Sequence, residues 1–450
     1  MPVRINITES DLTQAATSLS ATDIVFVPGL SSIDSSDVTG APETNQPTLC
    51  TSLSDFYTKF GSVPALFGSA QVYPVQDTEE GTVGFSADAI PGTGAAVAWF
   101  AANDPDPSFI YAATLLSMGI QVVYCRLNAK STITSGTYTG TVAQIYSAMS
   151  NIFAQNGDLY SRGDYQFKYV TSGGYPVYEY NDCAIANNMT ALASYRGDCV
   201  ALIDHTDNPA RALSGSTSVF MSLQSLTNAA MVSDYAAMYT PWAQYTQGVY
   251  TAGASTIFLP GSFAYLTSLA TALQSSANWL VIAGITRGLV PNLNYLHTNA
   301  VLTNAIADMY QNYSAGTAQS VCINAITNIK PYGLCIWGNR TLKSNSSSLK
   351  ALSFVNLRCL VCDIKKTVYD ACVSLMYEQN TSILWTNFKG AITPLLDQMV
   401  SGSGISTYKI VRNTIDSSIK ISASIRVYPV YAVESFDISV QITDSDITVS

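Results

Sequence analysis

The chain has 450 residues, 48% of them hydrophobic, which is enough for two or three domains with sizeable cores. Only 12% of the residues are charged, about half the usual share, and the net charge is −10. Nonspecific nucleic-acid binding needs clustered Lys and Arg, and the sequence has no such cluster, so this class of function is excluded.

The uncharged polar residues favour protein–protein contact. Ser, Thr, Asn and 27 Tyr take the place of the missing charges, as in the composition of interfaces. A monomer with an uncharged polar surface would have the same composition. We expect no signal peptide and no membrane insertion, because the longest apolar run, Trp279–Ile285, is far too short to cross a bilayer. The nine cysteines, an odd number, favour buried free thiols over a disulfide framework.

The chain opens with an amphipathic strand and then alternates strands with helices. Val3, Ile5 and Ile7 alternate with polar residues, and residues 30–50 have the composition of an exposed loop. Expected strands are Ile24–Val27, Ile120–Leu127, Phe167–Thr171, Cys199–Asp204 and Ile257–Leu259. Expected helices follow Ser108 up to Gly119 and cover Ala184–Tyr195 and Ser262–Gln274. This order predicts a layered α/β core with a partly parallel sheet.

The sequence changes character after about residue 330. We expect strands at Gly333–Gly338 and Phe354–Cys362, then helices at Lys365–Gln379 and Leu384–Val400. The last fifty residues are strand-like, and a final alternation carries Phe436, Ile438, Val440 and Ile442. The predicted organisation is an N-terminal arm (1–20), an α/β core (21–330), a smaller α+β domain (331–435) and a C-terminal arm strand (436–450).

The sequence lacks the motifs of common enzymes. It has no phosphate-binding loop, no HExxH and no GxSxG, and Gly92-Thr93-Gly94 lacks the third glycine of a dinucleotide site. A Ser-His-Asp or Cys-His site would have to use His205 or His297, and His205 follows an expected strand, where α/β enzymes place catalytic groups. A histidine satisfied by loop hydrogen bonds would look the same.

The sequence also gives little support for a metal site. Cys359 and Cys362 form a CxxC, but in a strand of period two their side chains point to opposite faces and cannot chelate one ion. Cys322 and Cys335 lack the second CxxC of a zinc site, and Asn103, Asp104 and Asp106 lack the frame of a calcium loop. We therefore expect no enzyme activity, no metal and no cofactor.

Both ends of the chain are strands without an obvious partner. An isolated strand must join a sheet to satisfy its backbone groups. The arms therefore either fold back onto their own domain or add to the sheet of a neighbouring molecule.

Several stretches, taken in order, resemble contractile phage tail sheath proteins. The sharpest is Gly333–Leu342 (GLCIWGNRTL), followed by Phe354–Arg358 (FVNLR), and later by Glu378-Gln379-Asn380 and Leu384-Trp385. Tyr239-Thr240-Pro241-Trp242, Ser172–Pro176 and Ala201–Thr206 are similar to parts of the sheath core. The resemblance runs from about residue 20 onward. This chain departs from the pattern in having Cys359-Leu360 where the family usually has a basic pair.

The resemblance implies a structural subunit of a contractile tail sheath. Such subunits stack in helical rings around an inner tail tube, meet baseplate and tail terminator proteins, and drive the tube through the host envelope on contraction. The implied location is the virion, with assembly in the host cytoplasm. The resemblance also implies strand exchange between subunits through Val3, Ile5, Ile7, Phe436, Ile438, Val440 and Ile442, and a helix facing the tube, for which Lys365 and Lys366 are the candidates. The alternatives are the sheath of a headless, tailocin-like particle and an α/β hydrolase-like enzyme that uses His205.

Overall fold

A computed structural model describes most of the chain. It covers residues 23–33, 41–69, 102–154, 157–175, 177, 184–204, 233–240, 242–246, 256–296, 323–343, 350–413 and 420–433, and the backbone of four short strands between 74 and 97.

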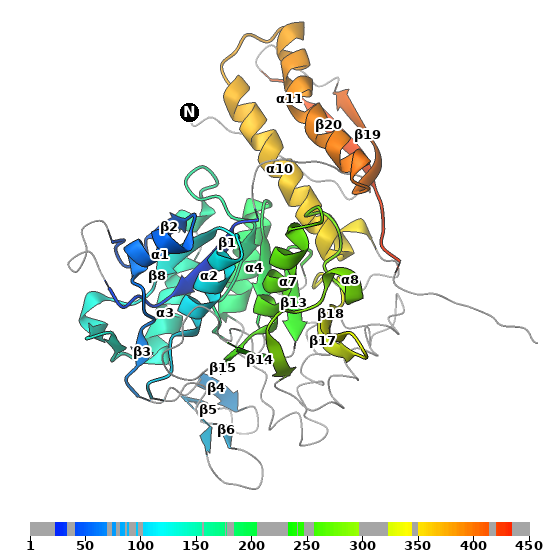
Figure 1. Cartoon of the computed structure of the whole chain (residues 1–450). Helices are drawn as coiled ribbons and strands as arrows, with labels where there is room; N and C mark the ends of the chain where they lie inside the picture. Colours follow the sequence, from blue (N-terminus) through cyan, green and yellow to red (C-terminus); the bar gives the residue numbers. More distant parts are fainter. Residues whose placement is uncertain are drawn as a thin grey trace, which may run out of the picture.

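An eight-stranded sheet forms the centre of the main body (Figure 1), in the order β18-β17-β13-β12-β11-β1-β8-β2. Its strands are β1 (Val25–Gly29), β2 (Pro47–Cys50), β8 (Val122–Arg126), β11 (Tyr169–Val170), β12 (Val200–Ile203), β13 (Ala236–Thr240), β17 (Asn324–Ile329) and β18 (Gly333–Trp337). The six central strands run parallel, whereas the edge strands β2 and β18 pair antiparallel with β8 and β17.

Helices cover both faces of this sheet, because its strands are apolar on both sides. In β1, Phe26 packs into a cluster with α3 and α4, whereas Val25 and Val27 pack on the other face with α1, α2 and α7. The helices of the body are α1 (Leu53–Phe60), α2 (Pro107–Ser117), α3 (Val142–Ile152), α4 (Ala184–Arg196), α7 (Gly261–Leu273) and α8 (Gly284–Arg287). The predicted layered α/β core is confirmed.

Smaller sheets and single turns surround the body. The short strands are β3 (Leu66–Phe67), β4 (Pro74–Asp77), β5 (Thr82–Phe85), β6 (Asp88–Ala89), β7 (Ala96–Val97), β9 (Ile133–Thr134), β10 (Thr137–Tyr138), β14 (Ala243–Thr246), β15 (Thr256–Leu259) and β16 (Leu293–Leu296). The 3₁₀ turns are η1 (Lys130–Thr132), η2 (Asp158–Tyr160) and η3 (Ala351–Ser353). The strand expected at 257–259 is β15, but it pairs antiparallel with β14 in a separate three-stranded sheet and not in the core sheet.

A second unit projects from the body (Figure 1). We define the projecting unit as the C-terminal half of α10 (Val355–Leu375), together with α11 (Ser382–Ser401), β19 (Ile405–Arg412) and β20 (Ala423–Pro429). The two helices lie against the β19–β20 hairpin around a small core of Ile364, Ile392, Leu396 and Val427. The helix predicted at 384–400 is therefore α11.

Three local predictions need correction. The expected strand at 354–362 is the first part of α10, because this helix is buried on two sides and so reads as a continuous apolar run. The strand expected at 333–338 is β18, but it pairs with β17 in the core sheet and not in the C-terminal domain where we placed it. Asp106, and not Ser108, is the N-cap of α2, with Pro107 at the first position.

Candidate functional site: the junction between the body and the projecting unit

Helix α10 joins the two units and crosses the amino ends of four parallel strands. A charged residue lies one or two positions before each of these strands: Asp23 before β1, Lys168 before β11, Asp198 before β12 and Asp234 before β13. The middle of α10 meets this row with Arg358, Asp363, Lys365 and Lys366, all less than 10% exposed. The junction is therefore a polar seam in a chain with few charges.

Lys168 is the centre of the seam. Its fully buried ammonium group lies 2.9 Å from Asp23 Oδ1 and 2.7 Å from Asp363 Oδ2 on α10. Burial disfavours the charged form, yet the two carboxylates outweigh burial and hold the pKa of Lys168 well above its ordinary value. Burial raises the pKa of Asp363. Asn278 Nδ2 adds longer hydrogen bonds of 3.4 Å to Asp23 and 3.3 Å to Asp363.

Three basic residues of α10 also bind the body. Arg358 donates to the backbone oxygen of Asp234 at 3.2 Å and forms an ion pair with its carboxylate, while its guanidinium lies 4.0 Å from the ring centre of Tyr235. Lys365 Nζ donates to Tyr235 Oη at 2.8 Å, and Lys366 Nζ donates to Phe167 O at 2.7 Å. These contacts fix the direction in which α10 leaves the body.

Lys365 and Lys366, which we expected as a tube-facing pair, lie in the junction of their own chain. Each is 6% exposed, and each ammonium group donates a hydrogen bond inside its own chain. They are not free surface charges, because the first half of α10 lies against the strand ends and not on the outside of the molecule.

The sequence stretches that resemble the sheath family hold the start of α10. Asn339, just after β18, accepts a hydrogen bond from Val355 N at 3.1 Å through its backbone oxygen and from Asn356 N at 3.3 Å through Oδ1. Its Nδ2 donates to Asn356 Oδ1 at 2.8 Å, and Arg340 lies over the Phe354 ring at 4.8 Å. Since the first amide groups of a helix lack partners inside it, Asn339 supplies partners for two of them.

The CxxC lies in this part of α10. Cys359 and Cys362 are both buried in the cluster that also holds α2 and α7, and burial raises the pKa of both thiols, that of Cys359 to about 11. The two side chains do not oppose each other on a strand, as we predicted, because the segment is helical. Among the described residues, no group of three or more His, Cys, Asp or Glu could hold a metal ion.

At the opposite, carboxyl edge of the sheet lies a closed polar cluster. Asp204, directly after β12, is fully buried and accepts hydrogen bonds from Ser172 Oγ at 2.9 Å, Ser262 Oγ at 2.8 Å and Ser262 N at 3.2 Å. Burial outweighs these hydrogen bonds and raises the pKa of Asp204 to about 7. The cluster ties β11 and β12 to the beginning of α7.

Described residues pack closely at the position where α/β folds bind ligands. In this strand order it lies at the carboxyl ends of β1 and β11, where the chain direction along the sheet reverses. Here Gly173, at φ +69°, lies so close to β1 that an added Cβ would stand 2.0 Å from Pro28 O. Buried Asp106 accepts from Leu30 N at 3.1 Å and from the Tyr175 and Ser108 hydroxyls. Asp106 therefore acts as a structural cap of α2 at this edge of the sheet.

Other predicted positions lie outside the described residues. These are His205, His297, Cys322, the Gly92–Gly94 turn and both arms with Val3, Ile5, Ile7, Phe436, Ile438, Val440 and Ile442. Within the described part of the chain, no helix is long and apolar enough to span a membrane.

Comparison with solved structures bears directly on the fold. No protein-family model and no curated protein matches the sequence. The sheath complex of an extracellular contractile injection system (PVC) in its contracted state matches with a TM-score of 0.54 and 15% identity, over 99% of this chain and 98% of that one. The contracted helical sheath of the anti-feeding prophage matches with a TM-score of 0.53 and 14% identity, over 98% of each chain.

The chain has the fold of contractile sheath proteins. A chain of the baseplate structure of the anti-feeding prophage gives a further match, with a TM-score of 0.56 and 14% identity over 98% of this chain and 99% of that one. The match extends over nearly the whole length, so it includes the body, the junction and the projecting unit of the sheath fold. The resemblance inferred from the sequence is confirmed at the level of the fold.

Sequence reasoning missed the residues that form the junction. Lys168 and Asp363 are 195 positions apart, and no local pattern connects them. A usable signal was present, because charged residues are rare in this chain and four of them stand just before strands that are otherwise buried. In such a position a charge needs a partner, and α10 provides it.

Proposed function

We propose that this chain is the structural subunit of a contractile sheath and that copies of it stack in helical rings around an inner tube. The observation that carries the proposal is the match of nearly the entire chain to subunits of contracted sheaths. Sheath contraction moves subunits between two lattice packings, and a lower free energy of the contracted packing would supply the work. No catalytic group is required.

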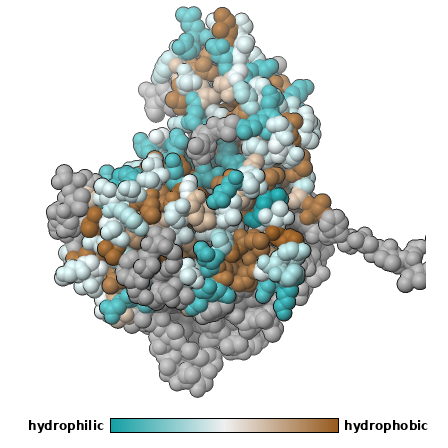
Figure 2. All heavy atoms as spheres, viewed as in Figure 1, coloured by the Kyte–Doolittle hydropathy of each residue, from teal (hydrophilic) through white to brown (hydrophobic). Residues whose placement is uncertain are grey.

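The projecting unit supports an assembling role. Of the fifteen large hydrophobic side chains that are exposed among the described residues, nine lie at the end of α10, on α11 and around β20. Tyr377 is 86% exposed and Val433 69%, and Figure 2 shows apolar residues scattered among polar ones over this unit. Exposed apolar residues are thus more frequent on this unit than on the body, which supports contact with another protein through it.

We further propose that the β19–β20 hairpin accepts strands from neighbouring subunits. Among the described residues these two strands pair only with each other, which leaves both outer edges for another strand. The arms would supply those strands through Val3, Ile5 and Ile7 at one end and Phe436, Ile438, Val440 and Ile442 at the other. The arms would then link subunits that reorient during contraction.

Deletion of residues 1–10 tests this role of the arms. We expect the variant to be a folded monomer, with the circular dichroism and the unfolding midpoint of the full chain, that does not extend into a lattice. Pelleting and electron microscopy of the full chain and the variant, each mixed with tube protein, measure this. Sheaths of normal length from the variant would contradict an essential N-terminal arm.

The further partners would be an inner tube protein, a baseplate and a terminator, whether the particle is a phage tail or a headless injection particle. In a phage the subunit would assemble in the host cytoplasm and serve genome ejection. Neighbouring genes for capsid and DNA-packaging proteins would assign it to a phage tail, and their absence would assign it to a headless particle.

A further inference from the structure

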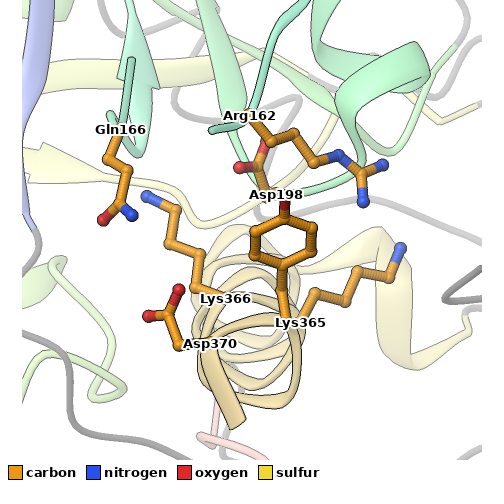
Figure 3. A pocket seen from close by; sticks show the side chains of 7 residues that line it. Arg162, Gln166, Asp198, Lys365, Lys366 and Asp370 are labelled. Atoms are coloured by element: carbon orange, nitrogen blue, oxygen red, sulfur yellow. The ribbon is translucent and has the colours of Figure 1, made fainter. Parts of the chain in front are cut away.

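A pocket lies beside the junction, between α10 and the loops that precede β11 and β12 (Figure 3). Its lining residues are Arg162, Gln166, Asp198, Lys365, Lys366 and Asp370, together with Tyr369. The two lysines and Asp198 are buried, whereas Gln166 and Asp370 are exposed at its rim. The pocket therefore has a charged, buried floor that is open to a partner.

The pocket is basic although the chain is acidic. Its lining contains Arg162, Lys365 and Lys366 together with two carboxylates, and one of these, Asp198, forms an ion pair with Arg196 at 2.9 Å outside the lining. The lining therefore has three basic residues and two acidic ones, whereas the whole chain has a net charge of −10. An anionic group is the ligand that this arrangement favours.

Lys366 has unused hydrogen-bond donors that are buried at the floor. An ammonium group has three donors. Within the described part of the chain the only hydrogen bond of Lys366 is the one to Phe167 O, and its side chain is 6% exposed. Figure 3 shows its ammonium group on the Gln166 side of the pocket. A buried charge with unused donors is costly, and an entering carboxylate would satisfy them.

The backbone keeps the pocket open. Gly197 lies at φ +66°, and an added Cβ would stand 3.1 Å from Lys365 Nζ and 3.8 Å from Arg162 Nη2. A larger residue would be strained there and would occupy the space between the two cations.

We propose that this pocket binds carboxylates of residues 434–450 of a second copy of the chain. That segment contains Glu434, Asp437, Asp444 and Asp446 and no Lys or Arg, so its charge is complementary to the pocket. The proposal rests on the proposed function insofar as it requires contact between copies. It adds an anchoring point to the strand exchange, at the place where the projecting unit meets the body.

Peptide binding to the purified full chain tests the proposal. A peptide of residues 434–450 with a neutral dye is titrated with the chain at concentrations where the chain is monomeric, and fluorescence anisotropy is measured. We expect saturable binding that K366M weakens at least about tenfold, as expected when one partner of a buried charge pair is lost, and that R162Q weakens as well. K59M, which removes a lysine on α1, is the matched control and should bind as the unaltered chain does. Every variant also contains its own residues 434–450, which compete with the added peptide to the same extent in all of them.

The outcomes separate this inference from the sheath role. A peptide with its four acidic residues changed to amides should not bind, and if it binds within twofold of the acidic peptide the proposal is overturned. Unchanged binding by both K366M and R162Q would overturn it as well. R162Q keeps the test valid if K366M unfolds, because Arg162 is only partly buried. If sheaths form on tubes but the peptide does not bind to the chain, this inference alone is overturned. If the peptide binds but no sheaths form, the sheath role is overturned.

Discussion

Replacing Lys168 by Met should destabilise the protein strongly, because it leaves two carboxylates without their cation. The ammonium group lies 2.9 Å from Asp23 and 2.7 Å from Asp363, and the side chains of Lys168 and Asp363 are 0% and 6% exposed. Removing one partner of a buried ion pair costs about 3–5 kcal/mol, most of it from the charge that stays buried. We expect a loss in this range, reduced if Asp363 takes up a proton.

Urea unfolding followed by tryptophan fluorescence measures the loss, since a lower midpoint with an unchanged slope reports a change in stability. The matched control is K59M, which breaks a partly exposed pair with Asp55 at 2.8 Å. It should cost less than about 1 kcal/mol. The double variant K168M/D363N removes the stranded charge on α10 and should recover part of the loss.

The reasoning would be refuted if K168M lost less than about 1 kcal/mol, or if K168M/D363N were less stable than K168M. Either result would mean that water or local rearrangement compensates the carboxylates, so that the seam does not hold α10 against the body.

The other predictions concern Asp204, Asn356 and two buried thiols. The raised pKa of Asp204, about 7 against 3.8 in an ordinary carboxyl, means that the folded chain keeps a proton which the unfolded chain loses. The stability from this group is therefore fully present below about pH 4, falls as the pH rises to about 7 and is constant above, a change of roughly 4 kcal/mol. D204N should flatten the pH dependence of the unfolding free energy between pH 5 and 8. An unchanged pH profile would contradict the burial argument. N356A removes the hydrogen bonds with Asn339 Nδ2 and with the backbone oxygen of Trp279. It should lower the free energy of unfolding, measured in urea, by about 1–3 kcal/mol. The control N328A, at an exposed strand position, should have little effect. Burial raises the pKa of Cys125 well above its ordinary value and that of Cys199 to about 12. Peptide mapping after iodoacetamide treatment at pH 8 should therefore find both thiols unlabelled in the folded chain and labelled in urea. Labelling at equal rates in both states would show that the core opens readily.

The sequence predicted the parts of the fold that depend on local patterns. The strands that became β1, β8, β11 and β12 and the helices α2, α4, α7 and α11 were recognisable, because apolar runs of strand length alternate with helices that begin and end at Pro and Gly. The layered α/β class followed from their order. The placement of β15 and β18 did not, because the choice of a partner strand depends on contacts between distant parts of the chain.

Helix α10 shows why the candidate site was harder to predict. Its first half packs Val355 and Cys359 against the body, while Leu360 and Ile364 face the core of the projecting unit. Two apolar stripes leave little periodicity, so the segment also fits a buried strand. Because residues 354–362 were predicted as a strand, Lys365 and Lys366 stood at the start of a separate predicted helix. Their burial against the strand ends could not be predicted from that assignment.

Electron microscopy of the purified chain mixed with preformed inner tubes from the same gene cluster tests the sheath role most directly. The tube supplies the nucleus for the first ring, so failure to start assembly cannot hide an ability to polymerise. The account predicts striated hollow cylinders of this chain around the tubes, with subunits in helical rings. Bare tubes beside small uniform particles of the chain, at concentrations well above those of the tube protein, would contradict it.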